Sequence, residues 1–380
     1  MASIHAPHDM PMASIPRWVT VALPERWVVT RCAAVLAAAA LLHSTGPALS
    51  APLDPLLEAG PHTKAGTGFL ELSSDGMSKQ LDLLRLRPEG LTDDAAGVLR
   101  GFRLRAGYGV NSRLWIDGGF FRRQIFYGGL GPFFNGWQLG GQWRLRESLG
   151  RWSGPDVSLR LNAWGNESGT ISVPRGTLER YRSFDLLDSL SVNGASDRQL
   201  QTDLVSTWWN GGSVWSLFAG TGVGRVSVDS ITASVGPFST TWRGGRFDSD
   251  LIQSLAPTLG ISDALATINY QTRFVHGGAG VRVPLGNWAI RGGYQYFSIH
   301  RDGVDAFINS RSTDNTPYRI NHTLLGEVAY RMAPGMRVFV RGQAMSNQML
   351  SEMPLLYNSL TARRFNERYG ILSAGVMASF

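Results

Sequence analysis

The sequence predicts an all-β fold, a single antiparallel transmembrane β-barrel of about 12 strands. Three observations predict it. Apolar and polar residues alternate along segments of roughly 11 to 16 residues, whereas strands of soluble sheets have about five or six. The connections between these segments are short and long in turn. Glycine is abundant, with 45 residues, while charged residues make up only 17% of the chain, against about 25% in a typical soluble domain.

Residues 1–50 are predicted to be a cleaved signal peptide. The apolar run Cys32–Leu42 is too short for a membrane-spanning helix, which needs about 20 residues, and arginines precede it. Small residues at Ala48 and Ser50 predict cleavage after Ser50. A membrane anchor or a short buried helix is the alternative, and translation could start at Met10 or Met12. Cys32 is the only cysteine, so the cleaved chain would hold no disulfide, zinc-thiolate site or cysteine nucleophile.

Residues 51–66 are predicted to form a short periplasmic N-terminal segment, and 67–380 the transmembrane β-barrel. The proline-containing segment is too short for a plug domain, so energised transport of the plugged type is not expected.

The barrel strands are identified by period-two alternation. In 100–110, for example, Phe102, Leu104 and Tyr108 share one face while Arg103 and Arg105 occupy the other. Because 67–74 is weakly patterned and Thr170–Pro174 could add a strand, ten or fourteen strands remain alternatives. The twelve predicted strands are 67–74, 100–110, 113–123, 136–146, 157–163, 199–209, 213–228, 267–283, 288–300, 318–331, 336–347 and 368–380.

Short connections follow every second strand, and long ones follow the others, with 125–133 as a shorter exception. Outer-membrane barrels separate short periplasmic turns from long extracellular loops in this way. Asn210-Gly211 also favours a tight hairpin, because both residues tolerate positive φ. The expected long connections are 75–99, 167–198, 229–266, 301–317 and 348–367.

The last strand ends on Phe380, with apolar residues at the alternate positions Leu372, Ala374, Val376 and Ala378. It resembles the C-terminal signature of bacterial outer-membrane proteins as a class. The resemblance implies recognition by the barrel-assembly machinery and a location in the outer membrane of a Gram-negative bacterium. No specific family is recognised, so no functional residue is carried over.

Aromatic residues beside the connections predict two girdles at the membrane interfaces, in contact with outer-membrane lipid and lipopolysaccharide. The alternative is the aromatic core of a soluble β-sandwich, whose strands would be shorter. The predicted girdle residues are Trp137, Trp208, Trp209, Trp215 and Trp288.

The polar faces of the strands are rich in arginine, and the formal net charge is +7. Because charges inside a low-dielectric wall are poorly screened, such a lumen attracts anions. We therefore expect a narrow passive channel that prefers small anionic solutes. The alternative is that the arginines fill the barrel and leave no pathway. The predicted lumen-lining and selectivity residues are Arg103, Arg105, Arg113, Arg144, Arg146, Arg160, Arg225, Arg273, Arg291, Arg319, Arg337 and Arg341, with Asp117, Asp203 and Glu327 as the acidic members.

Three long loops carry apolar residues at helical spacing, and short helices folded over the mouth or into the lumen would bury them. Contact with lipid or a partner is the alternative. The three sets are Met77, Leu81 and Leu84; Phe184, Leu187 and Leu190; and Leu251, Ile252, Leu255 and Leu259.

Signals for other functions are weak. Ser298 with His300, or Asn321 with His322, could belong to a lipid or lipopolysaccharide hydrolase, but no third member is visible and the chain is not expected to be an enzyme. The glycines at 220, 222 and 224 match a dinucleotide fingerprint only in part. We expect no cofactor, no metal and no nucleic acid. A non-conducting surface or envelope-assembly protein, for example one serving exopolysaccharide export, is the main rival to the channel.

Overall fold

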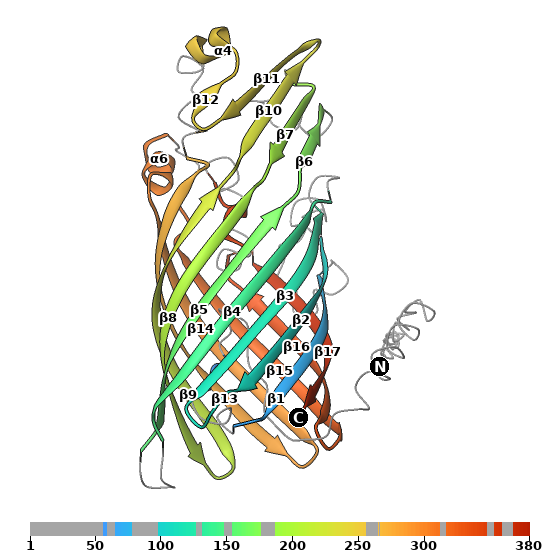
Figure 1. Cartoon of the computed structure of the whole chain (residues 1–380), viewed down its shortest axis with the longest axis vertical. Helices are drawn as coiled ribbons and strands as arrows, with labels where there is room; N and C mark the ends of the chain where they lie inside the picture. The colour runs from blue at the N-terminus through green and yellow to red at the C-terminus, as the bar shows by residue number, and fades with distance from the viewer. Residues whose placement is uncertain are drawn as a thin grey trace, which may run out of the picture. The chain divides into compact units, whose positions relative to one another are not determined.

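A computed structural model of the chain describes residues 56–58, 65–77, 98–126, 131–147, 154–175, 187–255, 265, 267–311, 317–347, 353–358 and 368–380. Twelve antiparallel strands close into one barrel in the order β1-β17-β16-β15-β14-β13-β9-β8-β5-β4-β3-β2 (Figure 1). The predicted fold class and the count of twelve barrel strands are confirmed. The predicted signal peptide lies outside the described residues.

The barrel strands begin and end within a few residues of the predicted bounds. They are β1 Gly68–Met77, β2 Val98–Gly109, β3 Leu114–Phe126, β4 Phe133–Arg146, β5 Asp156–Ser168, β8 Ser196–Asn210, β9 Ser213–Ser227, β13 Tyr270–Leu285, β14 Trp288–Arg301, β15 Ile320–Ala333, β16 Met336–Met345 and β17 Tyr369–Ser379.

The first and last strands close the barrel. Glu71 on β1 lies opposite Met377 on β17 in an antiparallel register. The backbone N–H of Gly68 donates to Phe380 O at 2.7 Å, and that of Phe380 donates to Gly68 O at 2.9 Å. The C-terminal residue therefore completes the hydrogen bonding of the first strand, and neither strand has a free edge there.

The tight turns and both ends of the barrel segment lie at one end of the barrel, the lower end in Figure 1. Gly211 and Gly212 join β8 to β9 with φ of 58° and 87°, a conformation that glycine adopts without strain. Gly286 and Gly335 have positive φ in two further turns. In the outer-membrane class the end with tight turns faces the periplasm.

A second, five-stranded sheet stands on the opposite, extracellular end (Figure 1), in the order β12-β11-β10-β7-β6. Thr170–Pro174 thus contributes to this sheet instead of adding a barrel strand, and the helix predicted around Leu187 and Leu190 is wrong, because Ser189–Asn193 is strand β7. Its strands are β6 Ile171–Pro174, β7 Ser189–Asn193, β10 Ser230–Val235, β11 Phe238–Arg243 and β12 Arg246–Phe247.

Two helices accompany the extracellular connections. Helix α4, Asp250–Leu255, forms where helical spacing predicted one, but its Leu251 is 67% exposed, so this leucine is not buried in the lumen. Helix α6, Val304–Arg311, was not predicted. The predicted loop positions Leu81, Leu84, Phe184 and Leu259 lie outside the described residues. Within the described part of the chain, no helix is long and apolar enough to cross a membrane.

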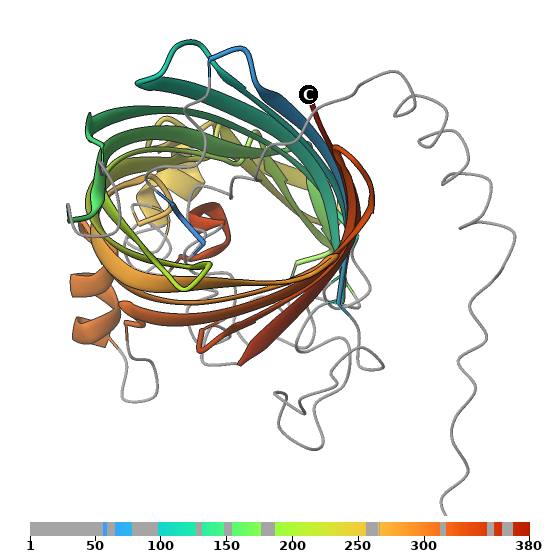
Figure 2. The ribbon, with the colours of Figure 1, turned by 90° about the horizontal axis from the view of Figure 1, so that it is seen from below.

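The extracellular end of the lumen holds an apolar cluster. Inward residues of the strands, such as Phe274 and Phe297, pack there with the loop residues Met353 and Leu355, and all are buried. Leu355 belongs to η2, Pro354–Leu356, a one-turn helix that Figure 2 shows inside the ring of strands. The Tyr270 hydroxyl lies 2.8 Å from Pro354 O and 2.6 Å from Tyr357 O. This loop therefore narrows the lumen from the outside.

Candidate functional site

Below the apolar cluster, the lumen wall is a layer of charged and polar side chains. Arg160 on β5 donates to both carboxylate oxygens of Asp117 on β3, at 2.8 and 2.9 Å, and both side chains are buried. A guanidinium matches a carboxylate in two parallel bonds, so the geometry of this pair is fixed.

A second group lies on β8, β13 and β14. His276 Nε2 is 2.8 Å from the Asp203 carboxylate, and both side chains are fully buried. The amide of Gln201 donates to Asp203, and that of Gln295 lies 3.0 Å from His276 Nδ1. Gly220 makes this possible, because a Cβ there would lie 2.6 Å from His276 Nε2. The glycine stripe at 220, 222 and 224 thus provides space for lumen side chains.

On the strands next to β14, Glu327 of β15 accepts from Arg341 at 2.7 Å and from Arg291 at 3.5 Å. Glu71 of β1 is paired more loosely, since its closest distances to Arg105 and Arg341 are both 3.9 Å. Neither oxygen of Glu71 makes a hydrogen bond, although both are buried.

Arg105 and Arg337, both inward-facing, have several buried donor atoms without hydrogen-bond partners. These are Nε, Nη1 and Nη2 of Arg105, and Nε and Nη2 of Arg337. The two residues lie at one level of the wall, because the register places Arg105 opposite Glu71, Glu71 opposite Met377, and Met377 opposite Arg337. This row, from Arg105 to Arg337, carries uncommitted positive charge in the lumen, and we call it the arginine row.

Residues 56–58 lie inside the ring of strands, as Figure 2 shows. Leu56, Leu57 and Glu58 are 4%, 1% and 4% exposed. The Glu58 carboxylate accepts two bonds from Arg282, at 3.0 and 3.2 Å, and one from Arg291 at 3.3 Å. These three residues of the segment 51–66, which is predicted to be periplasmic, thus lie buried, with Glu58 against arginines of β13 and β14. A carboxylate buried between arginines is far more stable than one placed beside a neutral wall.

Ten of the predicted lumen residues lie on the inward face. They are Arg103, Arg105, Arg144, Arg160, Arg291, Arg337, Arg341, Asp117, Asp203 and Glu327.

The other five predicted lumen residues do not line the lumen wall. Arg113 and Arg146 are exposed beside periplasmic turns, and Arg225 and Arg273 are exposed on the outward face. Arg319 precedes β15, is 43% exposed and donates to Asp305 at 2.9 Å. The assignment failed at Arg225 and Arg273 because the extracellular lumen is apolar, so the inward neighbours there include Tyr270 and Phe274, and the usual alternation is reversed.

Several inward acids were missed, so the lumen is less basic than predicted. Asp75, for example, accepts from Arg123 at 3.1 Å, and Asp305 pairs with Arg301 at 3.3 Å. In β1, the alternation of Glu71, Ser73 and Asp75 with Leu70 and Leu72 could have indicated an inward face. The acids missed are Glu58, Glu71, Asp75, Asp156, Asp197 and Asp305, and all are buried.

Four predicted girdle tryptophans lie on the outward face. Trp208 and Trp215 are directly opposed on β8 and β9, and the Trp288 and Tyr330 rings contact each other at a tilt of 52°, with 4.7 Å between their centroids. Trp137 is 38% exposed beside Phe120. Trp209 does not share this outward orientation. It lies two residues after the inward-facing Thr207, at the end of β8, and donates to Asp156 at 3.3 Å.

The candidate hydrolase residues do not assemble. His300 is 57% exposed and faces Asp302 and Asp305 at 3.5 and 3.7 Å, with no hydrogen bond to Ser298. His322 Nδ1 and the Tyr294 hydroxyl form a hydrogen bond of 2.8 Å on the outward face. Asn321 is fully buried on the inward face. Among the described residues, no group of three or more His, Cys, Asp or Glu side chains could hold a metal ion.

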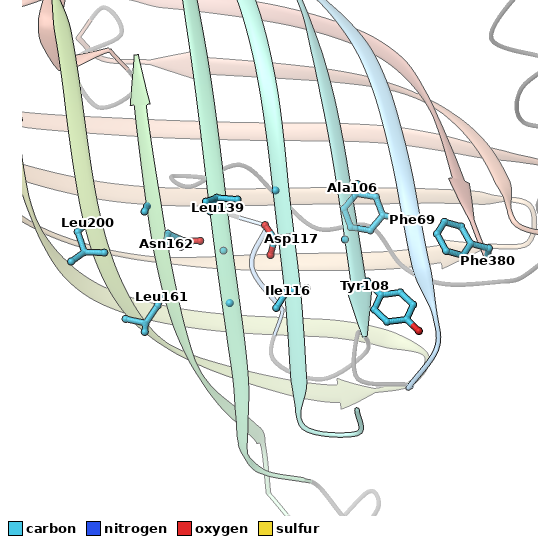
Figure 3. A pocket seen from close by; sticks show the side chains of 15 residues that line it. Phe69, Ala106, Tyr108, Ile116, Asp117, Leu139, Leu161, Asn162, Leu200 and Phe380 are labelled. Carbon is cyan, nitrogen blue, oxygen red and sulfur yellow. The ribbon is translucent and has the colours of Figure 1, made fainter. Parts of the chain in front are cut away.

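A hollow of about 640 Å³ lies against β2 to β5 and β8 (Figure 3). Its apolar lining side chains are exposed on the outward face, where the small residues Gly118 and Gly141 leave room. The hollow therefore belongs to the lipid-facing wall and is not a solute site. Those side chains are Tyr108, Ile116, Leu139, Leu161 and Leu200.

No model of a known protein family matches the chain, and no curated protein matches it. Solved structures match over most of its length. The translocator domain of autotransporter NalP from Neisseria meningitidis is 9% identical, with a TM-score of 0.48, over 82% of this chain and 87% of that domain. An outer membrane channel from Pseudomonas putida F1 is 8% identical, with a TM-score of 0.43, over 87% and 100%.

Outer membrane phospholipase A from Escherichia coli is also similar, at 9% identity and a TM-score of 0.32, over 82% of this chain and 92% of that one. A translocator, a channel and a lipase share this likeness, which carries no argument about function.

The closed wall of twelve strands, the polar lumen and the apolar outward face define a bacterial outer-membrane β-barrel protein. The outward face is apolar over the middle of the strands, where Leu200, Leu204, Leu217, Val223 and Val275 are exposed.

Proposed function

We propose that this barrel is a narrow passive channel for small anionic solutes. The observation that carries the proposal is the arginine row, where Arg105 and Arg337 hold buried guanidinium donors on the inward side of the wall without a hydrogen-bond partner. A buried donor left unsatisfied costs about 1–3 kcal/mol, and more when it is charged. Water or an anion in the lumen removes that cost, so the row supports a hydrated path past these two residues.

The position of the row explains how selectivity could arise although acids offset most of the lumen arginines. Asp117 is committed to Arg160, and Glu327 to Arg341, so these charges largely cancel at a distance. Arg105 is paired loosely with Glu71, at 3.9 Å, and the charges of Glu71 and Glu327 act on Arg337, which makes none of the ion pairs described here; Met377 lies opposite it on β17. An anion entering the lumen would meet net positive charge at this level.

Planar-bilayer recording in a salt gradient tests the proposal. The expected result is a small, steady conductance whose reversal potential shows anion preference, and Arg337→Gln should reduce that preference. Arg331→Gln is the matched control, because Arg331 lies opposite Arg337 on β15 but is exposed at the periplasmic mouth. Silent insertion or cation preference would overturn the proposal.

A non-conducting envelope protein is the second candidate, and the apolar cluster at the extracellular end favours it. The cluster and η2 occupy the lumen at that level. The extracellular sheet also exposes Phe238 at 77% and Val235 at 45%, and exposed apolar residues at the tip of a hairpin favour contact with a partner. If a variant lacking Met353–Tyr357 also stays silent in bilayers, this function replaces the channel.

A further inference from the structure

The contact between Glu58 and two arginines has the form of a ligand in a binding site. Glu58 reaches Arg282 and Arg291 from a segment that is not part of the wall, and its two oxygens accept three bonds. Arg291 is 2% exposed and Arg282 is 21% exposed. Both are fixed on neighbouring strands in direct register. The barrel strands thus hold the arginine pair in place, while the occupant of the pair, Glu58, comes from residues outside the strands.

Residues 56–58 are held by side-chain contacts instead of strand pairing. Leu57 packs against Val205 and Phe218, and Gln142 donates to Glu58 O at 2.9 Å. None of the strand pairings described above includes Leu56, Leu57 or Glu58. Release of these three residues would therefore break their own contacts, including those of Leu56, but none of the described strand pairings.

We propose that Arg282 and Arg291 form a carboxylate-binding site in the lumen, and that Glu58 is its internal competitor, which a small carboxylate solute displaces. This rests on the proposed channel function for its physiological role, but the displacement is measurable without conductance. A carboxylate solute presents the same two oxygens as Glu58, so it can make the same bonds to the two guanidinium groups. Occupancy by solute would then release Leu56–Glu58 from the lumen.

Thiol labelling of Leu57→Cys tests displacement directly, in a background where Cys32, the only native cysteine, is replaced by serine. A membrane-impermeant maleimide should label this buried position slowly. Adding Glu58→Gln should accelerate labelling several-fold, because a neutral amide loses the charge attraction of both arginines. Millimolar acetate should accelerate labelling of the Glu58 form, whereas chloride at equal ionic strength should not.

Glu167→Gln is the matched control, since Glu167 is an exposed carboxylate on the outward face of β5, and it should leave the labelling rate unchanged. Equal labelling rates with and without Glu58→Gln, or acceleration by chloride as strong as by acetate, would overturn the proposal. If acetate accelerates labelling but the protein shows no conductance in bilayers, the proposed channel function is contradicted and the proposed carboxylate site is supported.

A separate observation concerns the outward face. On three adjacent strands, the apolar band of the outward face ends in an exposed arginine on its extracellular side. The leucine or valine that ends the band and the arginine two positions away are Leu200 and Arg198, Val223 and Arg225, and Val275 and Arg273. Arg198 and Arg225 are directly opposed across β8 and β9. Like charges in such a pair repel, and an anion between them would offset the repulsion. Arg273 is 73% exposed, with Asp302 at 3.8 Å.

We infer that Arg198, Arg225 and Arg273 bind the phosphate groups of a lipid in the outer leaflet. The end of the apolar band places them at the depth of lipid headgroups, where phosphate is the anion that arginine recognises best. An outer-leaflet glycolipid with phosphates on its sugar base fits this position.

The test compares the wild type with Arg198→Gln/Arg225→Gln/Arg273→Gln for binding of lipopolysaccharide and of the same lipid after removal of its phosphates. The wild type should prefer the phosphorylated lipid several-fold, and the variant should lose that preference. Arg113→Gln/Arg146→Gln/Arg331→Gln, which changes three exposed arginines at the periplasmic end, should keep it. Equal binding of both lipids by the wild type, or displacement by millimolar inorganic phosphate alone, would overturn the lipid site.

Discussion

Arg105 and Glu71 lie directly opposite each other on neighbouring strands, yet their closest charged atoms are 3.9 Å apart. Glu71 therefore neutralises the charge of Arg105 only in part, and the remaining positive potential acts in the lumen. A unit charge acting through water at about 8 Å contributes about 0.5 kcal/mol, a factor of about two in relative permeability. Arg105→Gln should lower the anion-to-cation permeability ratio by about that factor, measured as a shift in reversal potential. An unchanged ratio would show that the arginine row does not set selectivity.

Asp117→Ala should strongly destabilise the barrel, because it leaves the Arg160 guanidinium buried without its carboxylate. Breaking such a buried pair costs roughly 3–5 kcal/mol. The free energy of unfolding in lipid vesicles, followed by tryptophan fluorescence, measures the loss. Asp302→Ala removes the partly exposed partner of Arg273 and should cost less than about 1 kcal/mol. Similar losses in the two variants would contradict this ranking.

Gly222→Ala should destabilise the wall of β9. Its added Cβ would lie 2.6 Å from Leu200 O and against the Phe274 ring, neither of which can move freely. Overpacking of this kind costs about 1–3 kcal/mol. Gly326→Ala, where nothing lies within 4 Å of the added Cβ, is the control and should be nearly neutral in the same unfolding measurement.

The extracellular sheet should loosen in acid. The backbone N–H of Thr241 and the hydroxyl of Thr240 donate to Asp248, both at 2.8 Å, and lower the pKa of its carboxyl below the usual value. A lowered pKa means that the contribution to stability is present above about pH 3.9, the usual pKa. It is lost as the pH falls through the lower, folded pKa. Proteolysis of the β10–β11 hairpin should increase over that interval, and Asp248→Ala should remove the pH dependence.

Tyr270→Phe should release the loop that narrows the extracellular lumen. The Tyr270 hydroxyl is the donor that faces Pro354 O and Tyr357 O, and its loss costs about 0.5–1.5 kcal/mol and leaves buried carbonyls less satisfied. Protease cleavage near Tyr357 should become faster than in the wild type. Tyr330→Phe, which keeps the ring contact to Trp288 on the outward face, should not change it. Equal cleavage rates in Tyr270→Phe and the wild type would show that this hydroxyl does not hold the loop.

The twelve barrel strands could be predicted from the sequence because each crosses the bilayer between an apolar and a polar environment. Because of that requirement, apolar and polar residues alternate with a period of two over ten or more residues. The alternation predicts that Arg105 and Arg341 face inward, and both are buried. The extracellular sheet has no such environment. Its strands are short, and Ser189–Asn193 is partly buried on both faces, so its pattern could be taken for a helix.

The candidate site, too, could be predicted from the sequence only in part. The sequence by itself determined the fold class, the strand number and the presence of arginines on the polar faces, because alternation depends only on neighbours along the chain. Only the tertiary structure decided which charges remain uncommitted, because pairing depends on residues far apart in sequence. Glu58 and Arg282 are separated by 224 positions, and Glu58 enters the lumen from a segment without any alternation. Closing the barrel brings them together, and leaves Arg105 and Arg337 with donors that still face the lumen.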